Sequence, residues 1–568
     1  MSRGRRAGLV VGFACVSLAL TPMALAQDEP SRRVFVIDVP GVSFEELLGV
    51  PAVLDLARSG GAALMRVQQP VEPFAAYSQV DPGDMSAVVE WEMDPGAMGG
   101  LDVIGATIRE RIEGADVDEV LVIVMSRTGS AEMAAAGDEL HPIAIALGAP
   151  DRLFADRGEV GSLTSDTTRR TGVVTDLDVA PTVGSFLDVE PPAEGAGEPI
   201  RVVDEPAPFQ LRERYLAQRR MYVPIGTAAT IYVTVVGLLG AAFVWLGPRV
   251  PEALRRAVGW ACLSAAAIGT GLLAVGHLPQ LTYAAAVPFV AIVTAFGTLA
   301  FSPLERRGAV WVPAGIGAGV LGFFAAEALL GWAAMLTPLL GGTHLDGGRF
   351  YGLPNVAIGL LVGASLWFAQ RLRTWVGVAL VVVVALGAGL PYVGSNLGAG
   401  VTLFATAGLW LAVRERHRLG PWKGVAVVAL AVLGGTAVIL LAHRISPLPT
   451  HVTRFEETAG GLAGAWETFV DRLDIGVDLI RGNPAALVPV VGLLASLAVA
   501  LRPPAVIAAT FQRWPAWRDA IVVCLLAGIV AYVANDTGAA AAGFAFGLGL
   551  GGMLGVSLLA GPGKMVGP

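Results

Sequence analysis

One stretch divides this chain: Val223-Pro-Ile-Gly-Thr-Ala-Ala-Thr-Ile-Tyr-Val-Thr-Val-Val-Gly-Leu-Leu-Gly-Ala-Ala-Phe-Val-Trp-Leu246. It contains no charged side chain, and a helix needs about 20 apolar residues to cross a bilayer. We therefore expect a membrane span here. On its N-terminal side the sequence is rich in acids, and on its C-terminal side long apolar runs alternate with short basic connections.

The composition agrees with a large membrane part. Of the 568 residues 54% are hydrophobic and 15% charged, with a mean hydropathy of +0.64, whereas soluble proteins carry about 25% charged residues. We predict an all-α membrane domain of about eleven helices over residues 221–568. After the first span, the other ten segments are 258–276, 281–301, 310–333, 354–369, 375–393, 397–413, 424–442, 485–501, 518–534 and 538–560.

The basic residues predict the orientation of these spans. Cytoplasmic loops of membrane proteins carry an excess of Lys and Arg. If residue 220 is outside, every second connection is basic, and the short outer ones carry almost no basic residue except Arg349. The predicted cytoplasmic cations are Arg249, Arg255, Arg256, Arg306, Arg307, Arg371, Arg373, Arg414, Arg416, Arg418, Lys423, Arg502, Arg513 and Arg518. The C-terminus is then cytoplasmic and the membrane is the plasma (inner) membrane.

The first 26 residues resemble a secretory signal peptide. Arg3, Arg5 and Arg6 precede an apolar run over 9–20, and Ala24-Leu-Ala26 fits a cleavage site. An uncleaved anchor helix is the alternative. Either interpretation places residues 28–220 outside the cytoplasm. This segment carries 34 acids against 16 bases, an acidic balance that argues against nucleic acid as a partner.

Residues 28–220 show the pattern of an α/β domain. Short apolar runs typical of buried strands cover 33–38, 120–125 and 142–147, and a helical pattern covers 44–58. Continuous apolar strands alternating with helices predict a parallel or mostly parallel sheet covered on both faces. Functional residues of such sheets gather at the carboxyl ends of the strands, where Asp38, Ser126 and Arg127 stand.

These motifs resemble the alkaline phosphatase and sulfatase superfamily. The resemblance is carried by Val34-Phe-Val-Ile-Asp38, by 161–172, and most of all by Val174-Thr-Asp-Leu-Asp-Val-Ala-Pro-Thr-Val183. The plan of an outer domain followed by many spans is similar to that of membrane phosphoethanolamine transferases. It is closer to uncharacterised bacterial membrane proteins with stretches like Gly347-Gly-Arg-Phe-Tyr-Gly-Leu-Pro-Asn355 and Asn535-Asp-Thr-Gly538.

The resemblance implies transfer or hydrolysis of a phosphate ester by a Ser or Thr nucleophile and divalent metal. Asp38 matches the first metal ligand of the family, but Ser126-Arg127 stands where an Asp-His pair is expected, and arginine cannot ligate a metal. Ser78 is at about the right distance for the nucleophile. A single Mn²⁺ or Zn²⁺ held by Asp38, His141 and another acid is one alternative. A degenerate domain that binds without cutting is favoured, and no cofactor is then needed.

Such a domain could still bind an anion. Arg127, Arg169 and Arg170 offer guanidinium groups for a phosphate, with Thr167 and Thr168 beside the last two. Salt bridges within an acidic domain are the competing interpretation.

Polar residues within or beside the spans are functional candidates because they are costly in a membrane. We expect a pocket on the outer side from Glu327, Asp346, Arg349, Tyr351, Asn355 and Asp536; helix caps and turns are the alternative, favoured for Asn396 and Thr537. The long connection 443–484 is predicted to contain an amphipathic helix on the membrane surface, or an additional packed helix.

Two classes of function follow. The first is a module that binds, presents or translocates an anionic amphiphile of the cell envelope, such as a lipid- or polyprenyl-linked intermediate. The second is an active metal-dependent phosphotransferase or phosphoester hydrolase at the outer face of the membrane. A scaffold that contacts other envelope proteins is a third.

Overall fold

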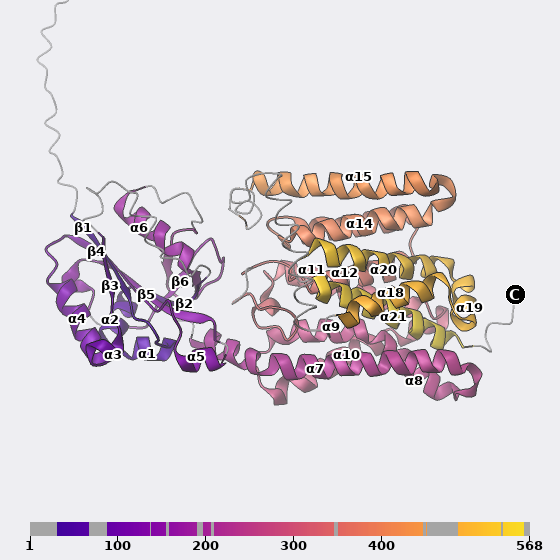
Figure 1. Ribbon diagram of the computed structural model, residues 1–568, viewed down its shortest axis with the longest axis horizontal. Coiled ribbons are helices and arrows are strands. Elements are labelled where there is room, and N and C mark those ends of the chain that lie inside the picture. Colours follow the sequence, from indigo (N-terminus) through magenta and orange to yellow (C-terminus); the bar gives the residue numbers. More distant parts are fainter. Residues whose placement is uncertain are drawn as a thin grey trace, which may run out of the picture.

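The computed structural model shows an α/β unit, the sheet domain, joined to a bundle of helices (Figure 1). It describes residues 31–67, 88–136, 138–154, 158–189, 197–205, 209–345, 350–446, 450, 487–535 and 538–561. The signal-peptide prediction lies outside these residues, as does nearly all of the predicted amphipathic connection.

The sheet is mixed, with strand order β3-β1-β4-β5-β2-β6-β8, and β7 pairs with β2. The strands are β1 (Arg32–Asp38), β2 (Gly61–Arg66), β3 (Val88–Glu92), β4 (Glu119–Met125), β5 (Leu140–Gly148), β6 (Ser162–Thr164), β7 (Val173–Thr175) and β8 (Arg201–Val203). The three predicted strands are present as β1, β4 and β5. However, β5 runs antiparallel to both β4 and β2, so the sheet is not purely parallel. Only the 14 residues between β4 and β5 (126–139), with the short α5 (Ala131–Ala136), connect this pair, too few for the usual crossover helix.

Helices cover both faces of the sheet, as the apolar strands predict. Successive strand residues point to opposite faces, so Phe35 and Ile37 pack on one side and Val34 and Val36 on the other. The first face is covered by α1 (Phe44–Gly49), α2 (Pro51–Ser59) and α4 (Leu101–Glu113), and the second by α6 (Val179–Leu187). A short α3 (Pro95–Met98) precedes α4.

The predicted single helix over 44–58 is two helices. Val50 has an extended backbone (φ −74°, ψ 118°), and Pro51 begins the second helix. A proline disfavours the helical conformation of the residue before it, which explains the break.

Seven described helices of the bundle are long and apolar enough to cross a membrane, or up to nine if each of two bent pairs forms one span. The prediction of eleven spans is therefore confirmed only in part, because two of the predicted segments are shorter apolar helices of 13 and 16 residues, α12 and α13. The helices are α7 (Phe209–Leu246), α8 (Glu252–Leu263), α9 (Ala265–Ala274), α10 (Tyr283–Leu299), α11 (Trp311–Leu329), α12 (Ala357–Ala369), α13 (Thr374–Gly389), α14 (Leu397–Arg414), α15 (Arg416–Arg444), α18 (Leu487–Leu501), α19 (Ala505–Arg513), α20 (Pro515–Ala534) and α21 (Gly538–Ala560). The bent pairs are α8 with α9 and α18 with α19.

The basic connections gather at the end of the bundle away from the sheet domain, which we call the far end (Figure 1). There Arg256 forms a bidentate ion pair with Glu305, with N–O distances of 2.6 and 2.8 Å. Arg414 and Arg416 both form ion pairs with the buried Asp519 of α20, with N–O distances of 3.2 and 3.1 Å. The end that faces the sheet domain is called the near end, and its described connections lack this excess of arginine.

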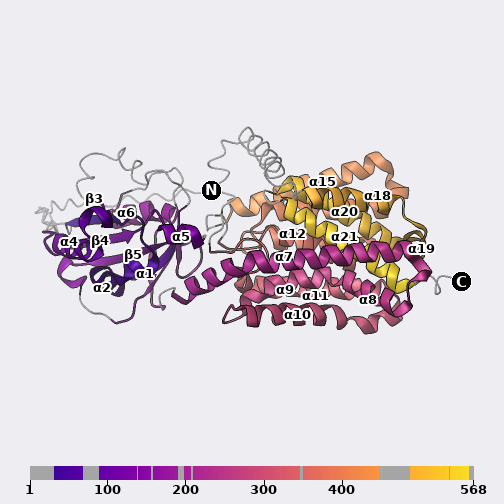
Figure 2. The same ribbon diagram turned by 60° about the horizontal axis from the view of Figure 1, so that its bottom comes forward.

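Helix α7 joins the two units without interruption. Its 38 residues begin beside the sheet domain and continue along the bundle (Figures 1 and 2). Tyr215 of α7 is fully buried and belongs to the same apolar core as the sheet face covered by α1, α2 and α4. Leu345 and Phe350, from the connection between α11 and α12, belong to it as well. The sheet domain therefore packs on the near end of the bundle through a shared core.

Candidate functional site

Two predicted site residues meet at the carboxyl ends of β1 and β4. The carboxylate of Asp38 accepts hydrogen bonds from the backbone N–H of Arg127 (3.0 Å) and from its Nε (2.9 Å). Glu90 of β3 lies 3.7 Å from the same guanidinium. Asp38 is buried, and the favourable pair with Arg127 compensates its burial. Arg127, which stands where metal ligands were expected, thus binds the Asp38 carboxylate that would have been the first metal ligand.

His141 lies near this pair, at the start of β5. Burial lowers the pKa of His141, and Arg66 lowers it further, whereas Asp38 and Glu139 act in the opposite direction. A metal would need several such ligands around one point. Among the described residues no group of three or more His, Cys, Asp or Glu side chains could hold a metal ion. Since Arg127 holds both oxygens of Asp38, the residues present do not fit the predicted Mn²⁺ or Zn²⁺ site.

The carboxyl ends of the central strands face the bundle. Arg212 of α7 is buried and pairs with Asp138, which precedes β5, at 3.0 Å, and with Glu45 of α1. Burial raises the pKa of Asp138. Beside this group, Phe209 packs edge-on against Phe44 with ring centroids 5.2 Å apart. The edge of the sheet where α/β domains commonly bind ligands is therefore directed at the near end of the bundle.

A buried aspartate shapes the loop 165–172 between β6 and β7. Asp178 accepts hydrogen bonds from the Ser165 hydroxyl (2.7 Å), from the Thr167 hydroxyl, and from the backbone N–H groups of Thr175 (2.8 Å) and Glu198 (3.0 Å). Burial raises the pKa of Asp178, and its four donors oppose that shift. The Thr-Asp-Leu-Asp motif of the sequence thus has a structural role here: it holds the loop that carries Arg169 and Arg170.

These two arginines reach the bundle. Arg170 donates from Nε to the carbonyl oxygen of Phe350 (2.9 Å) and from Nη2 to Nδ1 of His344 (2.8 Å). The guanidinium of Arg169 lies over the ring of Tyr351, 4.0 Å from its centroid, and donates to the carbonyl oxygen of Pro391 at 3.4 Å. Arg169 also has a left-handed backbone (φ 53°), which is costly for a residue other than glycine. We call this set the arginine junction.

The arginine junction is chemically unusual because, among the described residues, the side chain of Arg170 contacts only neutral groups. Arginine can only donate hydrogen bonds, so His344 Nδ1 is the acceptor and this ring is neutral. Burial lowers the pKa of Arg170 to about 10, so the group is still protonated at neutral pH. Among the described residues no carboxylate pairs with Arg170, whereas Arg127 and Arg212 each pair with two. Its Nη1 also forms no hydrogen bond with the described part of the chain.

The predicted membrane pocket is spread over separate contacts. Helix α11 ends at Leu329, so Glu327 lies in its last turn at the near end rather than deep in a span. Its carboxylate pairs with His277 and accepts the N–H of Ala334 (3.0 Å).

Asn355 accepts a hydrogen bond from the Asn396 side chain (2.8 Å), and Asn396 is the N-cap of α14, as its sequence context predicts. Among the candidates that the structure describes, Tyr351 alone belongs to the arginine junction. Ser78, Asp346, Arg349, Asp536 and Thr537 lie outside the described residues.

Sequence reasoning missed three partners in this region. His344 and Phe350 lie inside stretches singled out for their polarity, yet neither was selected. Arg212 lies among the bases that end the acidic segment. Only its burial between Asp138 and Glu45 distinguishes it from neighbouring arginines, and burial is not visible in a sequence.

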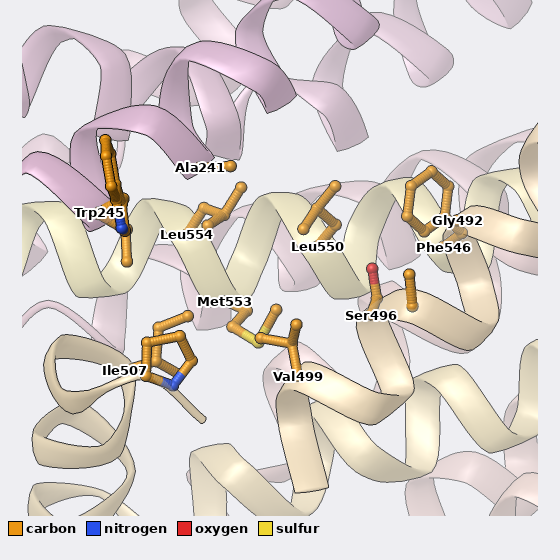
Figure 3. A pocket seen from close by; sticks show the side chains of 13 residues that line it. Ala241, Trp245, Gly492, Ser496, Val499, Ile507, Phe546, Leu550, Met553 and Leu554 are labelled. Atoms are coloured by element: carbon orange, nitrogen blue, oxygen red, sulfur yellow. The ribbon is translucent and has the colours of Figure 1, made fainter. Parts of the chain in front are cut away.

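A separate cavity of about 300 Å³ lies between α7, α18, α19 and α21 (Figure 3). Apolar side chains line it, including Trp245, Phe546 and Met553, and Ser496 is the one hydroxyl-bearing residue among them. None of its described lining residues is titratable, so the cavity offers space for hydrocarbon rather than an acid or a base.

Together these features define a class: a protein with several long apolar helices, compatible with a polytopic membrane protein, and with a mixed α/β domain packed on one end of those helices. No protein-family model, curated protein or solved structure matches the chain.

Proposed function

We propose that the protein binds an anionic amphiphile at the arginine junction, with the sheet domain covering the near end of the bundle. The amphiphile would be a lipid- or polyprenyl-linked component of the cell envelope that the protein presents or translocates. The near end would face outward from the plasma membrane, because the basic connections lie at the far end. The sheet domain would be a degenerate, alkaline-phosphatase-like domain that binds without cutting.

One observation carries the proposal: Arg170 is a protonated group at the contact between the units, and no described carboxylate neutralises it. Burying a cation away from water is costly unless an anion pairs with it. A phosphate would provide that anion and would accept from Nη1. The pair of Arg127 and Asp38 already balances its own charge, so the anion is expected at Arg170 and not there.

Binding of farnesyl diphosphate and farnesol to the full-length protein in a neutral detergent tests this proposal. The two probes share the farnesyl hydrocarbon chain, and only farnesyl diphosphate is charged. Arg170→Gln keeps a donor for the Phe350 carbonyl but removes the charge. A charged hydrogen bond is worth about 1.5–3 kcal/mol, so the variant should bind farnesyl diphosphate about 10- to 100-fold more weakly, with farnesol binding unchanged.

Arg201→Gln is the matched control. Arg201 lies in the same domain and pairs with Asp166 at the exposed edge of the sheet, so its loss should leave the binding of both probes unchanged. Equal affinity of Arg170→Gln and the unaltered protein for farnesyl diphosphate would refute the proposal. Metal-dependent release of phosphate that Asp38→Ala abolishes would favour the enzyme class instead.

A further inference from the structure

A long groove runs along the bundle between α7 and α10, which lie on the same side of the molecule as α9 (Figure 2). Its volume is about 630 Å³, within the range of ligand pockets. Small side chains create the space: Ala228 and Ala229 on α7 face Ala291 and Ala295 on α10. Residues of α8 and α9, among them Trp260 and Ile268, line it as well.

Polar atoms in the groove are largely satisfied within the protein. The hydroxyl of Tyr232 lies 2.8 Å from that of Ser264, and Ser264 donates to the carbonyl oxygen of Ala261 (2.7 Å). Thr298 donates to the carbonyl oxygen of Thr294, also at 2.7 Å. The hydroxyl of Thr294 is buried and has no hydrogen-bond partner among the described residues. Apart from this hydroxyl and that of Tyr283, the remaining described lining is aliphatic or aromatic, so the groove suits hydrocarbon rather than a strongly polar molecule.

The groove belongs to the part of the bundle that would face lipid. Both α7 and α10 are long apolar helices with little of their apolar stretch buried. Beside the groove, Ile292 and Phe296 of α10 are 66% and 74% exposed. An acyl chain of a bilayer lipid can therefore enter the groove from the side, without a movement of α7 or α10.

A cation stands at the near end of the groove. Residues four apart lie on the same face of a helix, and Pro224, Ala228 and Tyr232 all line the groove. Arg220 is the next residue of this row toward the sheet domain. It is exposed, forms no ion pair with a described residue, and its carbonyl oxygen accepts a hydrogen bond from groove-lining Tyr283 (3.1 Å).

We propose that this groove is a binding site for an anionic phospholipid of the surrounding bilayer. One acyl chain lies between α7 and α10 along the alanine row, and the phosphate lies at Arg220. This site is distinct from the arginine junction and does not depend on the function proposed there.

Photocrosslinking tests the proposed position of the acyl chain. The full-length protein is placed in phosphatidylcholine nanodiscs that contain phosphatidylglycerol with a diazirine on one acyl chain, and adducts are located by mass spectrometry. Adducts should concentrate on groove residues Ala291 and Thr294 over bilayer-facing Ile292 and Phe296. Ala228→Phe with Ala291→Phe should reduce labelling of the remaining groove residues at least fivefold. Ala242→Phe with Ala284→Phe, exposed positions on the same helices outside the groove, should not reduce it.

Replacement of Arg220 tests whether the site prefers an anionic head group. Arg220→Gln should lower groove labelling by the phosphatidylglycerol probe about two- to fivefold, as expected for an exposed charge, and leave labelling by a phosphatidylcholine probe unchanged. Equal labelling of both faces of α10, no effect of the paired phenylalanines, or crosslinks to a second protein copy would overturn the lipid site. An equal effect of Arg220→Gln on both probes would overturn its anionic preference. Neither result would bear on the loss of farnesyl diphosphate binding in Arg170→Gln.

Discussion

Replacement of Asp178 by alanine should destabilise the sheet domain and release the loop that carries Arg169 and Arg170. Four donors converge on this fully buried carboxylate: two hydroxyls and two backbone N–H groups. The hydroxyls can rotate toward other acceptors, but the N–H group of Thr175 has no such freedom. Leaving a buried donor without a partner costs about 1–3 kcal/mol. We expect a total loss of about 3–5 kcal/mol, because about 0.5–1 kcal/mol for each of the other three hydrogen bonds adds to this penalty.

Asp178→Asn should cost less, about 1–3 kcal/mol by the same reasoning. An asparagine oxygen can still accept from Thr167 and Glu198, while its NH₂ group would oppose the N–H of Thr175. The charge itself has a cost, because burial raises the pKa of Asp178 above its ordinary value of 3.8. The protonated carboxyl of Asp178 is therefore favoured by folding. Its contribution to the free energy of unfolding is complete below pH 3.8 and is lost as the pH rises through the higher pKa of the folded state. Asp178→Asn should lack this pH dependence.

Hydrogen–deuterium exchange of the full-length protein in detergent measures the effect in the sheet domain alone, through amides in the core of β4. A loss of 3 kcal/mol or more should accelerate their exchange at least about 100-fold. Asp166→Ala is the matched control: Asp166 lies in the same loop, but its pair with Arg201 is partly exposed, so about 1 kcal/mol or less should be lost. If the two alanine variants accelerate exchange equally, the structural role assigned to Asp178 is wrong.

Three further outcomes are expected. Arg212→Ala should leave Asp138 and Glu45 without their cation and make the start of α7 sensitive to limited proteolysis, whereas Glu213→Ala, on the exposed side of the helix, should not. Gly276→Ala should lower the melting temperature of the purified protein because the added Cβ would overlap the carbonyl oxygen of Ala334; Gly322→Ala, which meets open space, should have little effect. The pKa of His141 is lowered in the folded protein, so as the pH falls below about 6.5 this histidine takes up a proton in the unfolded chain first, and the folded state loses stability. The β4 amides should therefore lose protection from exchange between pH 7.5 and 5.5. The loss should be smaller in His141→Gln.

The candidate site was only partly accessible to sequence reasoning. Asp38 and Arg127 were expected at the carboxyl ends of two strands, and the parallel pairing of β1 with β4, which the sequence did not predict, places them together. Arg169 and Arg170 were expected to bind an anion or form salt bridges within their own domain. Instead they contact Tyr351, Phe350 and His344 of the bundle, residues about 180 positions later in the chain, and no local pattern predicts such a contact.

The sequence by itself determined the division of the chain, since hydropathy decides which segments can leave water for lipid. It also determined the strands with buried faces and the cap at Asn396, because side-chain alternation and capping are local properties. Only the tertiary structure decided the direction of β5, the number of helices long enough to span, and the packing of the sheet domain on the near end. Each of these depends on contacts between residues far apart in the chain. The positive charge of Arg170 follows from its residue type, whereas the lack of a carboxylate partner among the described residues is a property of the fold.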